Sequence, residues 1–338
     1  KLWYTKPASQ WVEALPLGNG RLGAMVFGGI AHERFQLNEE TLWSGALSDW
    51  NSPDAPAALP AVRAAIAAGE YEEADRRAKA LQGAFTEAYQ PLGDLHLDFV
   101  YGNNSGDVAA IDYYRDLDLN DATATVRYTV GGTTYTRRAF VSAPADVLVI
   151  QLTADRSAAL TFTARLDSVH PYQIATQDDI LLLTGKCPAH SEPNYRKVED
   201  PIHYADGEDG PGLNFAAAVT IQVEGGTVTA DKAAIHVANA DVATLYLTGK
   251  SGFVDFTQVP GLSQAAVAAQ AVAAQQSLTQ QSFANLLSAH LIDYQSLFQR
   301  VVLDLGTTPA AALPTDERIR NFQTGADPAL VTLLFQYG

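Results

Sequence analysis

Residues 37–43 combine the side-chain types that proteins use to bind sugars. The segment reads Leu-Asn-Glu-Glu-Thr-Leu-Trp, so that Asn38 offers an amide, Glu39 a carboxylate and Trp43 an indole ring. Aromatic faces pack on the C–H surfaces of a sugar, and amides and carboxylates hydrogen-bond to its hydroxyl groups. We therefore expect these three residues at the rim of a sugar-binding pocket or at a domain interface. The alternative is a buried turn, with Asn38 or Glu39 bonded to the backbone and Trp43 in the core.

A second group of polar side chains lies in a stretch rich in proline and glycine. Its members are His190, Glu192, His203, Asp206, Glu208 and Asp209. Histidines and carboxylates are common metal ligands, but these spacings match neither a calcium loop nor a zinc-binding histidine pair. We therefore expect an ordinary long loop that reaches toward a neighbouring domain, and we predict no metal site.

Residues 18–23 read Gly-Asn-Gly-Arg-Leu-Gly and match the glycine fingerprint of dinucleotide-binding proteins. That fingerprint requires a helix directly after the glycines, with its N-terminus at the pyrophosphate. Here residues 22–27 have the pattern of a strand, so we expect a glycine-rich hairpin and no cofactor. The sequence also contains no convincing Ser/His/Asp arrangement. No general acid or other catalytic residue can be named, because spacing does not show which carboxylates face each other.

The elements that must position these side chains are mostly strands. Residues 122–130 alternate between apolar and polar side chains, as a half-buried strand does, and Gly131-Gly132 then predicts a tight hairpin turn. A second hairpin is predicted at Gly225-Gly226. Further strands are expected at residues 95–99, 133–140, 147–153, 160–166, 180–184, 215–223 and 242–248. Many strands joined by short turns indicate a large antiparallel β-sandwich.

Helical patterns interrupt and follow the strands. Residues 59–66 and 71–81 each carry one narrow apolar stripe, so we expect both helices on the outside of the sandwich. After residue 260 the chain favours helices at 264–276 and 283–301, with Ser282 as a cap. Two more begin near Thr315, the expected cap, and at Asp327-Pro328. These last apolar stripes have no core of their own, so we expect the chain to be truncated there.

Composition and charge exclude several classes of protein. The 338 residues are 47% hydrophobic and 18% charged, which is typical of a globular protein. With 22 Lys and Arg against 38 Asp and Glu, the net charge of −16 repels polyanions, so we expect no nucleic-acid partner. No apolar run approaches the roughly 18 residues of a membrane span. The single cysteine, Cys187, forms no internal disulfide.

Several segments, in order along the whole chain, resemble the N-terminal region of glycoside hydrolase family 95, the 1,2-α-L-fucosidase family. They are residues 11–28, 36–45, 89–94, 114–119, 135–142, 290–305, 314–318 and 335–338. The resemblance implies a large β-sandwich, a helical linker, an (α/α)6 barrel and a C-terminal β domain. It also implies that the chemistry takes place in the barrel, where a glutamate acts as general acid and asparagines with an aspartate activate water, which inverts the anomeric carbon.

We therefore expect a mainly β chain with three parts. Residues 1–255 form the sandwich with its helical insertion, residues 256–313 a helical linker, and residues 314–338 the first part of the barrel. The expected function is that of the N-terminal part of an inverting exo-glycosidase similar to α-L-fucosidase, inactive alone, with a glycan substrate and its own barrel as partners. The alternatives are a free-standing carbohydrate-binding module and a structural spacer. Because the chain begins at Lys1 without a signal peptide, we expect a processed protein that is secreted or periplasmic.

Overall fold

The predicted alternation of buried and exposed side chains is present in the strands of this chain. In β8 (Thr123–Val130) every second side chain from Ala124 to Val130 is buried, whereas Arg127 between them is exposed. Gly131 and Gly132 follow with φ angles of 58° and 76°, which suit glycine and give the tight turn into β9 (Thr133–Ser142). The predicted hairpin is therefore confirmed. Gly225-Gly226 also has two positive φ angles, 67° and 64°. It joins β16 (Asn214–Glu224) to β17 (Thr227–Ala230), which belong to different sheets, so the hairpin predicted there is wrong.

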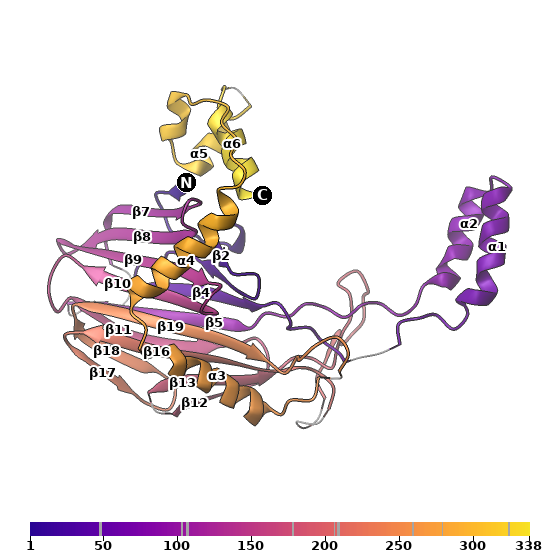
Figure 1. Cartoon of the computed structure of the whole chain (residues 1–338), viewed down its shortest axis with the longest axis horizontal. Coiled ribbons are helices and arrows are strands. Elements are labelled where there is room, and N and C mark those ends of the chain that lie inside the picture. Colours follow the sequence, from indigo (N-terminus) through magenta and orange to yellow (C-terminus); the bar gives the residue numbers. More distant parts are fainter. Residues whose placement is uncertain are drawn as a thin grey trace.

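The computed structural model describes residues 1–46, 49–102, 104–105, 108–177, 179–205, 207, 210–258, 260–278, 280–323 and 325–338. Within these residues, antiparallel strands form two large sheets that lie face to face (Figure 1). The predicted antiparallel sandwich is confirmed. No described helix is long and apolar enough to cross a membrane.

The first sheet has nine strands. In spatial order they are β1 (Leu2–Tyr4), β7 (Ile111–Asp118), β8, β9, β10 (Val147–Ala154), β19 (Val242–Ser251), β16 (Asn214–Glu224), β13 (Ile180–Lys186) and β12 (Tyr172–Gln177).

The second sheet has eight strands. In spatial order they are β17 (Thr227–Ala230), β18 (Ile235–Ala240), β11 (Leu160–Asp167), β5 (Gly93–Tyr101), β4 (His32–Glu39), β3 (Leu22–Val26) and β2 (Leu15–Gly18), with β6 (Asn104–Ser105) paired to β5. The glycine motif of residues 18–23 joins β2 to β3, so it is a hairpin, as predicted. A separate short pair is β14 (His190–Ser191) with β15 (Ile202–His203).

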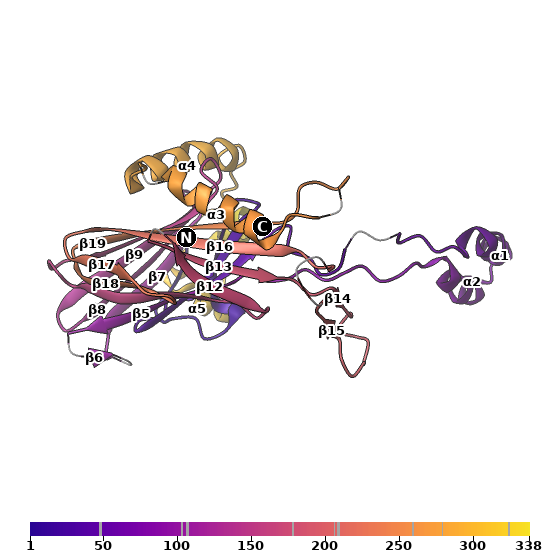
Figure 2. The same ribbon diagram turned by 90° about the horizontal axis from the view of Figure 1, so that it is seen from below.

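The middle strands of the nine-stranded sheet are buried on both faces, and the sequences of β10, β13 and β19 show this as continuous apolar runs. In β13, Leu181 and Leu183 face the other sheet, whereas Ile180 and Leu182 contact a helix on the outer face. That helix is α3 (Gln264–Leu278), and α4 (Phe283–Phe298) covers the neighbouring part of the same face (Figure 2). The Ser282 hydroxyl caps α4 by accepting from the backbone N–H of Asn285, as predicted.

The insertion between β4 and β5 lies away from the sandwich. It contains α1 (Ala55–Ala67) and α2 (Tyr71–Ala78), which Figures 1 and 2 show at the far end of two extended chain segments. The prediction that both helices lie on the outside of the sandwich is therefore wrong. Their narrow apolar stripes are buried against each other instead, and the buried residues are Val62, Ala65 and Ala74. We call α1, α2 and their two connecting segments the arm.

Two short helices lie beside the N-terminal strand. In α5 (Thr315–Asn321) the hydroxyl of Thr315 accepts from the backbone N–H of Trp3, and Pro314 rather than Thr315 precedes the first helical residue. The prediction that Thr315 caps this helix is therefore wrong. Helix α6 (Pro328–Tyr337) begins at Pro328, as predicted, and Asp327 caps it. Asp327 also pairs with the buried Arg318 at 2.8 Å. Short 3-10 helices occupy Trp11–Glu13, Lys79–Leu81 and Pro309–Ala312.

A buried ion pair joins the two sheets through the core. Glu33 on β4 belongs to one sheet and Arg137 on β9 to the other, and both side chains are almost completely buried. The Glu33 carboxylate also accepts from the backbone N–H groups of Gly28 at 2.7 Å and Arg34 at 3.0 Å. The Arg137 guanidinium donates to the hydroxyl of Tyr128 at 2.6 Å and lies over the Phe99 ring at 4.4 Å. Removing either partner leaves the other charge buried and unpaired.

We expect Arg137→Met to lower the free energy of unfolding by about 3–5 kcal/mol, because the Glu33 charge then has no partner in the core. The matched control is Arg127→Met, at an exposed position of β8, for which we expect the free energy of unfolding to change by no more than about 0.5 kcal/mol. Urea denaturation measures both values. If Arg137→Met had the same free energy of unfolding as the wild type, the ion pair with Glu33 would not stabilise the fold.

Candidate functional site

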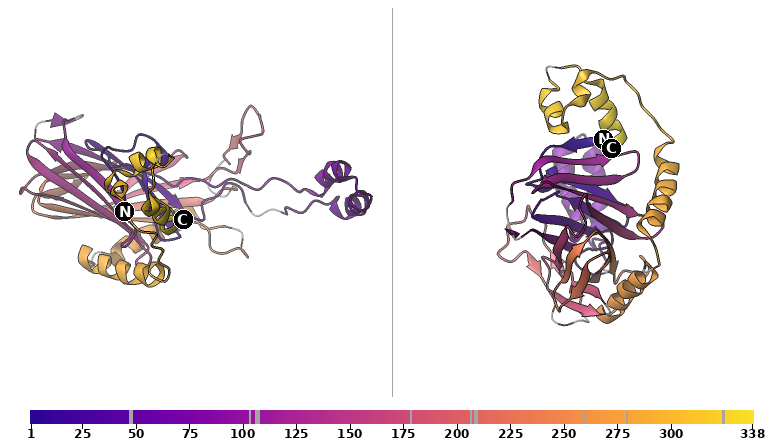
Figure 3. Two further views of the ribbon diagram at one scale, coloured as in Figure 1. Left: turned by 90° about the horizontal axis from the view of Figure 1, so that it is seen from above. Right: turned by 90° about the vertical axis from the view of Figure 1, so that its left-hand side faces the viewer.

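Long connections gather at one end of the sandwich. The arm leaves from this end between β4 and β5, and the loop that carries β14 and β15 leaves beside it (Figures 2 and 3). The segment after β19 also reaches this end, because Phe253, Asp255 and Phe256 line the same hollow as the start of the arm. Loops held by a rigid sandwich are common sites of ligand binding, so this end of the sandwich is the candidate functional site.

The hollow at this end has a volume of about 470 Å³ and an aromatic wall. We call it the first hollow. Trp43 is 46% exposed, Phe253 39% and Phe256 87%, and Trp50 lies with them. Glu40, Glu87 and Asp255 place carboxylates in the same lining. Exposed aromatic rings beside carboxylates suit the C–H faces and hydroxyl groups of a neutral sugar.

The structure places the three sequence candidates in different roles. Trp43 lines the first hollow, so the alternative that it packs in the core does not hold. Glu39 is fully buried and bound by Arg21 at 3.2 Å and by the backbone N–H of Thr41 at 2.9 Å. Its carboxylate is therefore committed to the turn that follows β4 and does not line the hollow.

Asn38 supports Trp43 through Tyr89. The Asn38 amide donates to the Tyr89 hydroxyl at 3.2 Å, and that hydroxyl donates to the backbone carbonyl of Glu39 at 3.1 Å. The Tyr89 ring meets the Trp43 indole edge to face, with centroids 5.6 Å apart. The indole N–H donates to the carbonyl of Glu40 at 3.3 Å. Asn38 and Tyr89 thus fix the orientation of the Trp43 ring at the edge of the hollow.

Glu87 ties three segments of this end together. Its carboxylate accepts from the Ser44 hydroxyl at 2.5 Å, from the His190 ring at 2.8 Å and from the backbone N–H of Ser191 at 3.1 Å. Ser44 lies at the start of the arm, Glu87 at its return, and His190 in the loop between β13 and β16. One carboxylate therefore holds the arm and this loop in place beside the hollow.

Two carboxylates of the first hollow, Glu87 and Asp255, are suited to binding rather than to proton donation. Burial opposes ionisation of Glu87, but the donors Ser44, His190 and Ser191 outweigh it and lower the pKa of Glu87. Hydrogen bonds from Thr257 lower the pKa of Asp255. A glycosidase general acid needs the opposite shift, a raised pKa that keeps its proton near neutral pH.

The polar loop predicted from its histidines is partly described. His190 lies between two carboxylates, Glu87 and Glu192, and its ring stacks on that of His203 at 6.1 Å. Asp206, Glu208 and Asp209 lie outside the described residues. Among those described, the loop pairs its histidines with carboxylates, and the prediction that it holds no metal stays a prediction.

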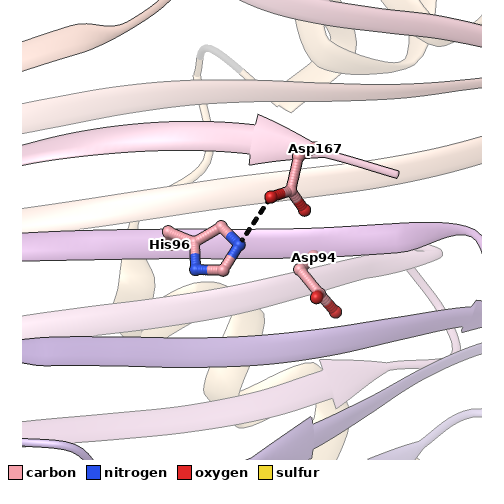
Figure 4. A group of neighbouring side chains, drawn as sticks. All are labelled: Asp94, His96 and Asp167. Atoms are coloured by element: carbon pink, nitrogen blue, oxygen red, sulfur yellow. Dashed lines mark hydrogen bonds and ion pairs between the residues drawn. The ribbon is translucent and has the colours of Figure 1, made fainter. Parts of the chain in front are cut away.

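Another His and Asp cluster lies on the outer face of the eight-stranded sheet. Asp94 and His96 come from β5 and Asp167 from the end of β11, with their ligand atoms within 4.8 Å of one another (Figure 4). The His96 ring bonds to Asp167 at 3.1 Å. Arg34 pairs with Asp94 at 2.6 Å. The guanidinium already supplies positive charge beside Asp94, so we interpret this cluster as an ion-pair network of the sheet surface.

Comparison with known proteins identifies the sandwich. Residues 2–255, which contain every described strand, match the glycosyl hydrolase family 65 N-terminal domain. The chain belongs to this family. Residues 282–338 match the glycosyl hydrolase family 95 catalytic domain, so the predicted resemblance to family 95 is confirmed.

Curated relatives of this glycosyl hydrolase chain are α-fucosidases by name. It is 35% identical over 347 residues to alpha-L-fucosidase 2 of Arabidopsis thaliana, with 100% of this chain and 41% of the relative covered. It is 27% identical over 371 residues to a probable alpha-fucosidase A of Aspergillus niger, with 100% and 42% covered. The chain thus spans less than half the length of these relatives. A putative kojibiose phosphorylase from the human microbiome superposes with a TM-score of 0.46 at 10% identity, over 88% of this chain and 38% of that one.

Sequence reasoning missed most of the hollow of this glycosyl hydrolase domain. Trp50, Phe253 and Phe256 lie in irregular segments without periodicity, so no pattern connects them to Trp43. Glu87 lies 103 residues from His190, and nothing local marks the pair. Their position could have been a signal, because aromatic residues outside the predicted helices and strands do not belong to a core and are therefore candidates for ligand binding.

We expect His190 to titrate above the usual histidine pKa of 6.5, because its hydrogen bond with Glu87 favours the charged ring. The pair then stabilises the loop below the His190 pKa and loses this effect as the pH rises through it. The stabilisation by Glu87 is lost when its carboxylate is protonated, as the pH falls through its own pKa, which lies below 4.5. NMR titration of the histidine rings should show a lower His190 pKa in Glu87→Gln, with Glu199→Gln as the control. Equal midpoints in wild type and Glu87→Gln would contradict the pairing.

For the cluster in Figure 4 we expect a chelator or added Zn²⁺ to leave the melting temperature unchanged, because Arg34 already pairs with Asp94. Thermal unfolding with EDTA and with Zn²⁺ measures this. A Zn²⁺-dependent rise in melting temperature that His96→Ala abolishes would show that the cluster is a metal site.

Proposed function

We propose that this chain is the N-terminal part of an exo-acting glycoside hydrolase that removes terminal α-linked L-fucose or a similarly configured sugar such as galactose. The observation that carries the proposal is the first hollow, where Trp43 and Trp50 line the same space as the carboxylates of Glu87 and Asp255. The names of the relatives from Arabidopsis thaliana and Aspergillus niger point to fucosides. The proposed role of this chain is to bind and orient the substrate.

The proposed reaction is an inverting hydrolysis in which the acid and the water-activating group belong to the catalytic barrel. Such hydrolysis needs two groups on opposite sides of the sugar, separated by room for a water molecule. Glu87 and Asp255 in the first hollow have lowered pKa values and accept hydrogen bonds, so their fitting task is to bind sugar hydroxyls. Trp43 supplies an apolar face that also excludes water from one side of the sugar.

The proposed partner of this chain within its own protein is the rest of the barrel. An apolar hollow of about 340 Å³ lies between β1 and the pair α5 and α6, lined by Leu2, Tyr4, Ile319 and Leu334 among others. Leu334 is 70% exposed, and a barrel seated there would cover it. We propose the division into residues 1–255, 256–313 and 314–338, and a secreted or periplasmic protein that acts on extracellular glycans.

We expect Trp43→Ala in the full-length protein to raise the KM for an α-L-fucoside by about two- to tenfold, because the sugar loses an aromatic face. The kcat should stay near the wild-type value if the ring binds ground state and transition state equally. Steady-state kinetics measure both constants, and Trp11→Ala, an exposed tryptophan outside the hollow, is the control. An unchanged KM with a lowered melting temperature would make Trp43 a purely structural residue.

A further inference from the structure

A second hollow lies directly beside the first and shares a wall with it. Its volume is about 570 Å³, and Gly45, Ala46, Trp50 and Glu87 line both hollows. Each volume falls within the range of about 300–1,000 Å³ that is usual for small-molecule sites. Two adjoining hollows of this size provide more room than one terminal sugar requires.

The residues that line only the second hollow are of the same types as those of the first: an aromatic ring beside hydrogen-bonding groups. Phe85 is 46% exposed and supplies an aromatic surface, and the Arg196 guanidinium lies over its ring at 5.3 Å. His190 and Glu192 add a ring N–H and a carboxylate to the lining. An aromatic face beside hydrogen-bonding groups again fits the two sides of a sugar ring.

The charges of the second hollow favour a neutral ligand. Arg196 pairs with Glu192 at 3.0 Å, and His190 pairs with Glu87 at 2.8 Å. Neither cation is therefore left for a carboxylate or sulfate group on the ligand. The net charge of −16 on the chain further disfavours an anion.

Phe85 is held next to Trp50 by a close approach of the two segments of the arm. At Gly83 a Cβ atom would stand 1.8 Å from the backbone carbonyl oxygen of Trp50, so only glycine permits this approach. The Phe85 ring also packs edge to face on Tyr195, with centroids 5.8 Å apart. Phe85 is therefore a positioned surface residue whose removal leaves the core intact.

We propose that the second hollow binds a further neutral sugar unit of the same oligosaccharide that enters the first. This inference rests on the proposed function and adds to it a second sugar-binding site on this chain, built from the arm and from the loop that carries His190. A ligand that spans both hollows lies against the shared wall of Trp50 and Glu87. The second hollow then contributes affinity only when the substrate is long enough to reach it.

The test compares a short and a long substrate in the full-length protein. The short one is an aryl α-L-fucoside, and the long one is a neutral fucosylated oligosaccharide of several sugars. We expect Phe85→Ala to raise the KM for the oligosaccharide about three- to tenfold and to leave the KM for the aryl fucoside unchanged. Trp43→Ala should raise both. Tyr71→Ala, an exposed aromatic residue of the same arm outside both hollows, is the matched control and should change neither.

The outcomes separate the inference from the proposed function. If Phe85→Ala changes neither KM, or raises both equally, the second hollow is not a sugar site. If Trp43→Ala changes neither KM, the proposed role of the first hollow fails by itself. Isothermal titration with a non-hydrolysable fucosylated oligosaccharide gives a readout without turnover: weaker binding to Phe85→Ala than to Tyr71→Ala supports the second site. Equal binding to the two variants, or no binding to the wild type, overturns it.

Discussion

The two sheets are joined inside the core by the ion pair between Glu33 and Arg137, and the rest of the structure depends on this junction. Around it, the inner faces of both sheets bury a continuous apolar core. A buried pair of charges tolerates little displacement, because separating the partners leaves each one unpaired in a medium of low polarity. The sheets therefore keep one alignment, and the loops at the end of the sandwich meet in one arrangement.

The hollow at that end follows from this alignment. The arm leaves β4, which carries Glu33, and returns into β5 of the same sheet, whereas the loop with His190 leaves from the nine-stranded sheet. Glu87 connects the two by accepting from His190 and from the backbone of Ser191. The sandwich thus supplies rigidity, and the loops supply the aromatic and ionised groups that suit a neutral sugar. The pKa values of Glu87 and Asp255 are lowered, so these carboxylates are suited to accept hydrogen bonds, whereas a general acid needs a raised pKa.

Much of the fold could be predicted from the sequence, because local patterns dictate it. Alternation in residues 122–130 and the Gly131-Gly132 turn identify a hairpin without any tertiary information. The position of α1 and α2 could not be predicted, since a narrow apolar stripe shows that a helix is partly buried but not by what. Trp43 can be predicted as a site residue because Asn38 and Glu39 lie close to it in the sequence. Glu87 cannot, because its partner His190 is 103 residues away. Contacts of that kind arise only when the chain is folded.

We propose that the two aromatic hollows at this end of the sandwich together hold one fucosylated oligosaccharide. A crystal structure of the full-length protein with a non-hydrolysable fucosylated oligosaccharide tests it most directly. We expect one sugar ring against Trp43 and another against Phe85, with Trp50 and Glu87 between them. Both hollows filled by other parts of the protein, with the oligosaccharide bound elsewhere, would contradict it.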